Sequence, residues 1–474
     1  MNIKYVAGIC FVATMGGLLF GYDWVVIGGA KPFFEKYFEI HSEHIRGWTN
    51  SCALLGCLVG ALGTGPLSER WGRKKMLLLA AVLFAVSSVL TGWAWAFNDF
   101  IFWRIAGGIA IGMAAAFSPV YIAEIAPAEY RGRLVAFNQL AIVIGILLAQ
   151  LVNWGIVVSM PTGFSEELIR DSWYGQYAWR WMFSAVAVPS VVFFVGVLLI
   201  PESPRWLVKA GLMEQAREVF RLVGGEQYAD AEIAAVQTSL RQIDREKPTS
   251  GVFSGYTKVL QPGMPLILLM GCFLAVLQQW SGINVIFNYA EEIFKAAGYD
   301  VKSIMFTIVF TGIVNLFATF IAIQTVDRFG RRRLMLLGCA GIALSHLLIA
   351  AACFFGFKGM VVVAPVLLAL VFYGLSLAPV TWVLIAEIFP NRIRSEAVSV
   401  STAALWIACF ILTYTFPPLT ALLGTAGTFV LYAVICLVGF VFIACRIPET
   451  KGKSLEQIER ELLGSDEKTA TPSL

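Results

Sequence analysis

The sequence predicts an all-α membrane protein of twelve transmembrane helices, arranged as two pseudo-symmetric halves of six helices each. Three observations predict this fold class. The chain of 474 residues is 58% hydrophobic and only 14% charged, with a mean hydropathy of +0.75, which is far more apolar than a soluble domain. Long apolar runs recur along it between short polar segments. Motifs of the first half also return in the second half.

Each apolar run is long enough to cross a bilayer, because a spanning helix needs about 20 residues. The expected spans are 5–28, 51–69, 76–96, 100–125, 134–158, 179–200, 264–288, 303–326, 334–356, 361–389, 396–416 and 426–446. An even number of spans places both termini on one side of the membrane. The connections on that side carry most of the Lys and Arg outside the central loop. We therefore expect both termini in the cytoplasm.

The longest polar segment separates the first six spans from the last six. It contains charged stretches that favour helices, so we interpret it as a helical linker on the cytoplasmic side. The expected divisions are a first half at 1–200, the linker at 201–262, a second half at 263–447 and a cytoplasmic tail at 448–474.

Three pairs of matching motifs carry the internal repeat. The matched segments are 69–74 with 327–332, 123–127 with 386–390, and 201–203 with 448–450. Each pair falls on the expected cytoplasmic side, as two parallel six-helix halves require. Such halves favour a central cavity that opens alternately to either side.

The repeated segments bring carboxylates and arginines to that same side. The carboxylates are Glu124, Glu202, Glu387 and Glu449, and the arginines are Arg70, Arg73, Arg131, Arg328, Arg331 and Arg394. We expect these groups to pair and to hold the cytoplasmic ends of the helices together when that side is closed. The alternative is that the charges only fix the topology.

The ordered set of motifs resembles the sugar porters of the major facilitator superfamily over essentially the whole chain, and is most similar to bacterial xylose/proton symporters. The motifs that carry this resemblance are Arg70–Lys74, Tyr130–Arg133, Pro201–Leu207, Gln278–Asn284, Asp327–Arg332 and Pro448–Gly452. The resemblance implies the major facilitator fold with a cytoplasmic helical insert. It also implies import of a monosaccharide, a xylose-like pentose or hexose, together with a proton by alternating access in the inner membrane of a bacterium.

Asp23 lies near the outer end of the first apolar run, where a carboxylate is unfavourable unless it is paired or faces water. Arg104 enters the antiparallel fourth run at a similar depth, so the two side chains are expected neighbours. A carboxylate that alternates between this partner and water can bind and release a proton. Proton-coupled sugar porters have an acid at the matching position, whereas facilitative relatives have a neutral residue. A static buried ion pair is the alternative.

Three amides lie in the seventh apolar run: Gln278, Gln279 and Asn284. Sugars present many hydroxyl groups and no charge, so a selective site needs side chains that both donate and accept hydrogen bonds. A regular helix would not align all three amides, and we expect Gly282 to interrupt it.

The resemblance adds further candidates for sugar contact. Gln139 and Asn315 match sugar-contacting amides of the family, although single amides also join neighbouring helices. Trp382, Trp406 and Phe20 are the aromatic candidates for stacking on the sugar ring, with core packing as the alternative. Trp382 follows a stretch at 374–379 that should distort the tenth span.

Two positions depart from the family pattern. Asn288 stands where sugar porters commonly have tyrosine, and it is followed by Tyr289. Leu405, before Trp406, replaces an amide found in relatives. The first departure means that the outer gate of the family does not transfer to this chain. The second removes a potential partner for a sugar hydroxyl, so the sugar specificity of the relatives does not transfer either.

We expect no cofactor, no metal site and no nucleic-acid partner. The partners are a monosaccharide, a proton and the lipid bilayer, and the resemblance implies a monomer. His41 and His44 lie in a polar outer loop without further ligands, and no nucleotide-binding motif occurs. The sequence also lacks a nucleophile and base pair within the spans, so an enzyme is disfavoured. A facilitative sugar uniporter and, less favoured, a transporter-like sugar sensor are the alternatives to a symporter.

Overall fold

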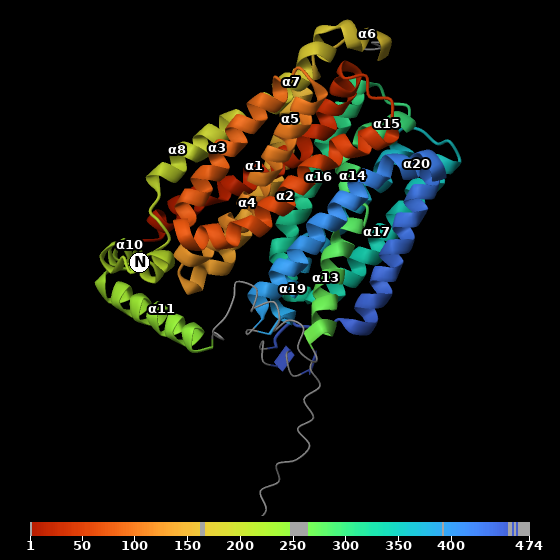
Figure 1. Cartoon of the computed structure of the whole chain (residues 1–474). Coiled ribbons are helices and arrows are strands. Elements are labelled where there is room, and N and C mark those ends of the chain that lie inside the picture. The colour runs from red at the N-terminus through yellow and green to blue at the C-terminus, as the bar shows by residue number, and fades with distance from the viewer. Residues whose placement is uncertain are drawn as a thin grey trace, which may run out of the picture.

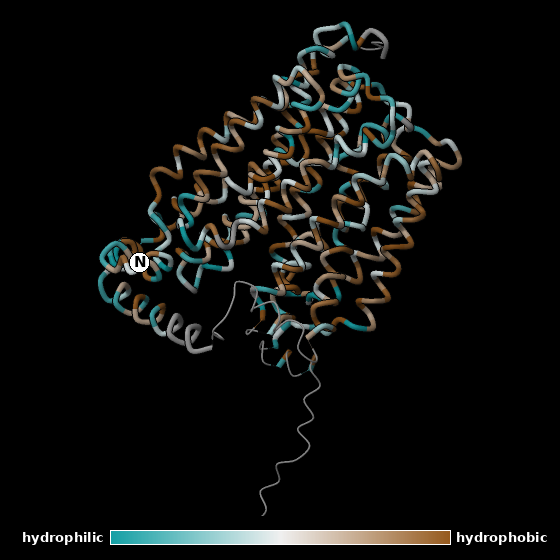
Figure 2. Tube along the Cα trace, viewed as in Figure 1, coloured by the Kyte–Doolittle hydropathy of each residue, from teal (hydrophilic) through white to brown (hydrophobic). Residues whose placement is uncertain are grey.

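The computed structural model describes residues 2–161, 166–246, 264–390, 393–453, 457–458 and 461–462. Every regular element within these ranges is helical. The long helices run side by side in one bundle (Figure 1), and apolar residues line most of their length (Figure 2). Since lipid offers no hydrogen bonds, a helix that bonds its own backbone is the structure such apolar segments must adopt.

The first half of the chain forms the helices of the first six spans. These are α1 (Ile3–Tyr37), α2 (Glu43–Trp71), α3 (Arg73–Gly92), α4 (Phe97–Ile125), α5 (Ala128–Val157), the short α6 (Glu166–Asp171), and a sixth span built from η1 (Tyr174–Ala178), α7 (Trp179–Ser184) and α8 (Ala187–Leu199). The π-helical turn η1 marks a local irregularity at the start of that span.

The second half repeats the pattern with more interruptions. Its helices are α13 (Met264–Trp280), α14 (Ile283–Asn288), α15 (Ala290–Ala296), α16 (Val301–Phe329), α17 (Arg331–Phe354), α18 (Met360–Leu375), α19 (Leu377–Ile388) and α20 (Arg394–Arg446). The long α20 contains two helices that meet at Gly424, whose φ of 69° is not helical.

Ten ranges of the described chain are long and apolar enough to cross a membrane. One of them, 396–446, is the α20 pair and supplies two spans, and α2 lies outside the ten. With α2 counted as a span, the described residues form twelve spans, and the predicted all-α membrane fold is confirmed. The first two helices extend farther than predicted: α1 continues to Tyr37 and α2 begins at Glu43. Their polar ends pair with one another, which lets both helices continue beyond the apolar run.

Three helices lie between the halves in sequence: α9 (Pro204–Lys209), α10 (Met213–Gly224) and α11 (Glu226–Glu246). Apolar side chains of the three, such as Leu207, Phe220 and Ala229, form a small core of their own. The rest of the predicted linker, at 247–262, lies outside the described residues, as does most of the predicted tail. The division of the chain into domains stays a prediction.

The bundle has two ends, which we name by what they carry. The terminal end holds the N-terminus, α10 and α11, and the distal end holds α6 and α15 (Figure 1). Within the first half the helices approach so closely that glycine is required at their crossings. A Cβ atom at Gly108 would overlap the carbonyl group of Ala53, which places α4 directly against the backbone of α2.

This contact yields a test of the packing. We expect Gly108→Val to destabilise the protein by about 1–3 kcal/mol, because the new methyl groups would force α2 and α4 apart. Gly155→Val is the matched control, since a Cβ atom at Gly155 meets nothing within 4 Å. Thermal unfolding in detergent compares the two variants. Equal melting temperatures for both would contradict the close α2–α4 packing.

Candidate functional site

The seventh span is interrupted between α13 and α14. Gly282 has a φ of 83°, a left-handed conformation, and a Cβ atom there would lie 2.8 Å from Nε2 of His346. The break frees the carbonyl group of Ser281 from the helix. Nε2 of His346 lies 2.7 Å from that oxygen, so this nitrogen carries the hydrogen and donates it. His346 therefore stabilises the break. The sequence predicted the break at Gly282 but not the contact with His346.

The three predicted amides of this span are brought together around the break. Nε2 of Gln279 donates to Oε1 of Gln278 over 3.4 Å, and Nδ2 of Asn284 donates to Oε1 of Gln279. Gln278 in turn donates to the carbonyl oxygens of Leu377 (3.0 Å) and Ala378 (3.2 Å). A continuous chain of amides thus runs from α14 to the tenth span.

The tenth span is interrupted as well. Ser376 has a φ of −132° and a ψ of −86°, and it separates α18 from α19 within the stretch predicted to be distorted. Gln278 donates to carbonyl groups directly after this break. The amide chain therefore joins the breaks of two different helices, which allows a ligand bound to these amides to act on both.

An aromatic cluster lies next to the amides. The ring centroids of Phe20, Trp24 and Trp406 are 5.8 to 6.1 Å apart in each pair, so α1 and α20 meet through this cluster. Trp406 is buried and its Nε1 has no hydrogen-bond partner. Three residues farther along α20, Sγ of Cys409 accepts a hydrogen bond from Asn284. Trp24 was not predicted, because only the fold reveals that it faces the predicted Phe20 and Trp406.

The other predicted sugar contacts lie on separate helices. Gln139 is half-buried on α5, Asn315 is buried on α16, and Trp382 is half-buried on α19. Within the described residues, no hydrogen bond joins them to the amide chain. Their contact with sugar stays a prediction.

The structure pairs Asp23 of α1 with Arg104 of α4. Nη1 of Arg104 donates to Oδ1 of Asp23 over 3.0 Å, and only 4% and 3% of Asp23 and Arg104 are exposed. The guanidinium group also lies 5.2 Å from the centre of the Phe183 ring. Two buried charges at this depth are favourable only as a pair, so loss of either partner leaves a strongly unfavourable charge.

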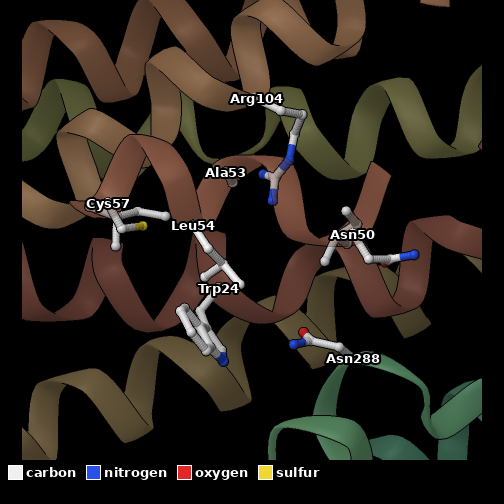
Figure 3. Close-up of a pocket in the computed structure, with 9 residues that line it drawn as sticks. Trp24, Asn50, Ala53, Leu54, Cys57, Arg104 and Asn288 are labelled. Atoms are coloured by element: carbon white, nitrogen blue, oxygen red, sulfur yellow. The ribbon is translucent and has the colours of Figure 1, made fainter. Parts of the chain in front are cut away.

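A small pocket adjoins this pair and draws residues from both halves. Figure 3 shows Arg104 and Asn288 directed toward the same space from opposite sides, with Trp24 and Leu54 beside them. Oδ1 of Asn288 is buried without a hydrogen-bond partner, and so is Nε of Arg104. The pocket therefore offers an unused acceptor and an unused donor next to an aromatic ring.

At the terminal end the first predicted charge cluster is assembled. Nε and Nη2 of Arg73 donate to Glu124 over 3.1 and 3.0 Å, and Ser203 donates to the same carboxylate. Glu202 accepts the backbone N–H groups of Arg73 (2.9 Å) and Lys74 (3.0 Å) at the start of α3. Burial raises the pKa of Glu202 above its ordinary value, and these N–H groups oppose that shift.

The second half repeats this geometry. Nη2 of Arg331 lies 3.3 Å from Oε1 of Glu387, and Glu449 accepts the backbone N–H groups of Arg331 (2.8 Å) and Arg332 (3.2 Å) at the start of α17. The pairs Arg73–Glu124 and Arg331–Glu387 each lie within one half and do not connect the halves. Closure of the terminal end by these groups stays a prediction.

Two further predicted arginines bond helix ends. Nη2 of Arg131 donates to the carbonyl group of Ala126, after α4, over 3.5 Å. Arg394 donates twice to the carbonyl group of Phe389, after α19, over 3.2 and 3.0 Å. The equivalent spacing in both halves follows from the repeat. The remaining predicted arginines, Arg70 and Arg328, are exposed.

An unpredicted charge lies between the halves at the distal end. Lys31 of α1 is only 1% exposed and forms an ion pair with Glu292 of α15. Its Nζ lies 4.1 Å from the centre of the Tyr289 ring and 3.8 Å from Glu35. Tyr289 donates to the carbonyl group of Thr413 over 2.7 Å. The sequence analysis ended the first span at residue 28, so it did not consider Lys31.

Other contacts close the same end. Gln150 of α5 donates to Thr311 of α16 over 3.2 Å, and the rings of Trp154 and Phe306 lie 5.9 Å apart on the same two helices. The halves are therefore joined at the distal end by hydrogen bonds, an ion pair and aromatic contacts.

Two parallel six-helix halves, closed against each other at one end and enclosing a polar site between broken helices, define a membrane transporter and not an enzyme. The chain belongs to the family of sugar (and other) transporters, whose model matches residues 9–462. Its fold is the major facilitator fold, as the relatives and solved structures below bear out.

Among curated proteins, the chain is 38% identical to the glucose transport protein of Synechocystis, with 96% of this chain and 97% of that protein covered. It is 35% identical to the D-xylose-proton symporter of Escherichia coli, with 97% and 96% covered. A solved structure of the E. coli xylose transporter in a partially occluded, inward-open conformation aligns with a TM-score of 0.83. That alignment has 32% identity and covers 95% of this chain and 100% of the other.

The distal ion pair leads to a prediction about conformation. We expect Lys31→Met to open the distal end, because Glu292 loses its partner in the other half. The expected result is about a tenfold larger population with separated distal ends. Nitroxide labels at the exposed positions Ser42 and Asp300, on opposite halves, would measure this population by pulsed electron paramagnetic resonance.

Arg46→Met is the matched control. Arg46 lies 3.4 Å from Glu35 and 2.9 Å from Glu43, and all three residues belong to the first half. Its loss removes one positive charge from the same region without breaking the contact between halves. An unchanged distance distribution in Lys31→Met, or an equal change in both variants, would exclude a latch at Lys31.

Proposed function

We propose that this protein imports a monosaccharide together with a proton by alternating access. The observation that carries the proposal is the buried Asp23–Arg104 pair, whose arginine lines the same pocket as Trp24 of the aromatic cluster. A site for a proton thus adjoins a site whose chemistry suits a sugar. The names of the relatives support it, since they include a D-xylose-proton symporter, an arabinose-proton symporter and a glucose transport protein.

The proposed sugar site combines two kinds of contact. The amides of Gln278, Gln279 and Asn284 can donate to and accept from ring hydroxyls, and the rings of Trp406 and Phe20 can cover an apolar sugar face. Gln139, Asn315 and Trp382 complete the proposed set of sugar contacts. Because the amides also bond the breaks of two helices, sugar binding would compete with those bonds and favour rearrangement of the helices.

Asp23 would carry the proton. With the site open to the outside, a proton from water binds the carboxylate and forms an O–H bond, so Asp23 loses its charge and its ion pair with Arg104. After the protein opens to the inside, the carboxylate returns the proton to water and the pair with Arg104 forms again. Since the proton and Arg104 compete for one carboxylate, proton binding is linked to the arrangement of α1 and α4.

The structure suits the state in which substrate leaves. Its distal end is closed, and two inward-open structures of the E. coli xylose transporter align with TM-scores of 0.83 and 0.82. We therefore assign the distal end to the outside and the terminal end, with both chain termini, to the cytoplasm of a bacterium. The inner membrane is then the compartment, and a single chain encloses the whole site, which supports a monomer.

The paired charges at the terminal end would serve as the cytoplasmic gate. In this state each cluster holds helices of its own half together, with Glu124 and Glu387 at the centres. When the cytoplasmic side closes, the two clusters approach, and the exposed Arg70 and Arg328 can then pair with carboxylates of the other half.

The test is sugar-dependent proton movement in liposomes. We expect pentoses or hexoses added outside to make the external medium alkaline, because protons enter with the sugar. Asp23→Asn should abolish the pH change while counterflow of labelled sugar survives, since the amide cannot release a proton. Asp99→Asn is the matched control, because Asp99 is exposed in the first turn of α4.

Each other outcome has a definite meaning. Labelled sugar that equilibrates without any pH change would establish a facilitative uniporter, with Asp23–Arg104 as a structural pair. Sugar binding without transport would favour a sensor. If the protein neither binds nor moves any sugar, the family and the fold still stand, but the assignment of a sugar as the substrate is wrong.

A further inference from the structure

Resting on the sugar transport proposed above, a narrower inference concerns the pocket between Arg104 and Asn288. We propose that Asn288 binds the exocyclic hydroxymethyl group of a hexose and so makes hexoses better substrates than pentoses. Arg104, Trp24 and Asn288 line this pocket, with Arg104 and Asn288 directed into it from opposite halves (Figure 3).

Asn288 has hydrogen-bonding capacity that no neighbouring group among the described residues uses. The residue is only 5% exposed, its Oδ1 has no partner, and its amide donates no hydrogen bond within the described chain. A buried amide in this condition is unfavourable unless a ligand or water satisfies it. A primary hydroxyl group both donates and accepts, so it matches the two ends of this amide.

Asn288 also lies within reach of the proposed sugar site. Asn288 follows Asn284 by four residues on α14, so the two side chains share a face of the helix and lie about 6 Å apart along its axis. Asn284 belongs to the amide chain that would hold the sugar ring. Trp24 belongs both to the aromatic cluster and to the pocket. A substituent on the distal side of a ring held by those groups therefore reaches Asn288.

The pocket ends beside Asn288, where α1 and α14 meet. A Cβ atom at Gly28 would lie 2.7 Å from the carbonyl oxygen of Phe287, so α1 and α14 are in direct backbone contact beside Asn288. The next residue, Tyr289, lies under the buried Lys31. A hydroxymethyl group in this pocket is thus shielded from outside water, where its hydrogen bond to Asn288 discriminates most strongly.

Three sugars isolate the group in question. D-Glucose and D-xylose differ only in the hydroxymethyl group on C5, and 6-deoxy-D-glucose keeps its carbon but lacks its hydroxyl. In liposomes with the wild-type protein we expect kcat/KM to fall in the order glucose, 6-deoxyglucose, xylose. Equal values for glucose and xylose, or a higher value for xylose, would overturn the inference.

Asn288→Tyr tests the space. The phenol ring would fill the pocket, so we expect kcat/KM for glucose to fall about tenfold or more while that for xylose changes less than about twofold. Retained xylose uptake shows that the variant is folded. A loss of the same size for both sugars would contradict a role in discrimination.

Asn288→Ala tests the hydrogen bond. The space remains but the amide is gone, so glucose should drop to the level of 6-deoxyglucose, whose own uptake is unchanged. Asn153→Ala is the matched control: Asn153 is also buried with an unpaired Oδ1, contacts Val26 of α1 and lies outside the pocket. Its glucose-to-xylose ratio should equal that of the wild type, and a matching shift in this control would overturn the inference.

The same measurements separate this inference from the function on which it depends. If the wild type moves no sugar at all, the proposed function fails and the inference fails with it. If the wild type moves sugar with a proton but glucose keeps no advantage that depends on Asn288, only the inference fails.

Discussion

Backbone hydrogen bonding in the membrane is the constraint on which this site depends. Lipid cannot satisfy a free carbonyl group, so a helix may break inside the bundle only where side chains replace the missing bonds. At Gly282 the carbonyl group of Ser281 accepts from His346, and at Ser376 the side-chain hydroxyl of that residue donates to the carbonyl group of Phe372 at the end of α18. Gln278, one of the amides of the proposed sugar site, lies against the second break and donates to the two carbonyl groups that follow it.

Lipid cannot solvate a charge either, so a charged side chain inside the bundle needs a partner, and α1 carries two such side chains. Asp23 and Lys31 lie eight residues apart on this helix, and each is buried against a partner on another element. Arg104 holds the first within its own half, whereas Glu292 holds the second across the two halves. If α1 moves relative to α4, the separation of Lys31 from Glu292 would also shift Asp23 relative to Arg104, because both residues belong to one continuous helix.

The fold was predictable because apolar runs, repeats and breaks are visible in composition and spacing. Asp23, Arg104 and the three amides were predictable for a related reason: a polar group inside an apolar run must have a partner or a ligand. Trp24 was not predictable, since its contacts depend on α1 and α20 meeting in space. Asn288 was visible only as a departure from the family pattern, and its place in the pocket depends on α1 and α14 meeting as well. The role of Lys31 was not predicted, because the expected span was ended where the apolar run stops, whereas helix α1 continues to Tyr37.

The position of Arg104 explains how sugar and proton could be coupled without a long pathway. Its Nη1 bonds Asp23, while its unpaired Nε and the rest of the guanidinium group border the pocket opposite Asn288. In the proposed function, a sugar hydroxyl in that pocket and a proton on Asp23 would act on one side chain from two directions. Sugar that bonds the guanidinium would weaken its hold on the carboxylate and favour proton binding, and linkage would then require that a bound proton strengthen sugar binding equally.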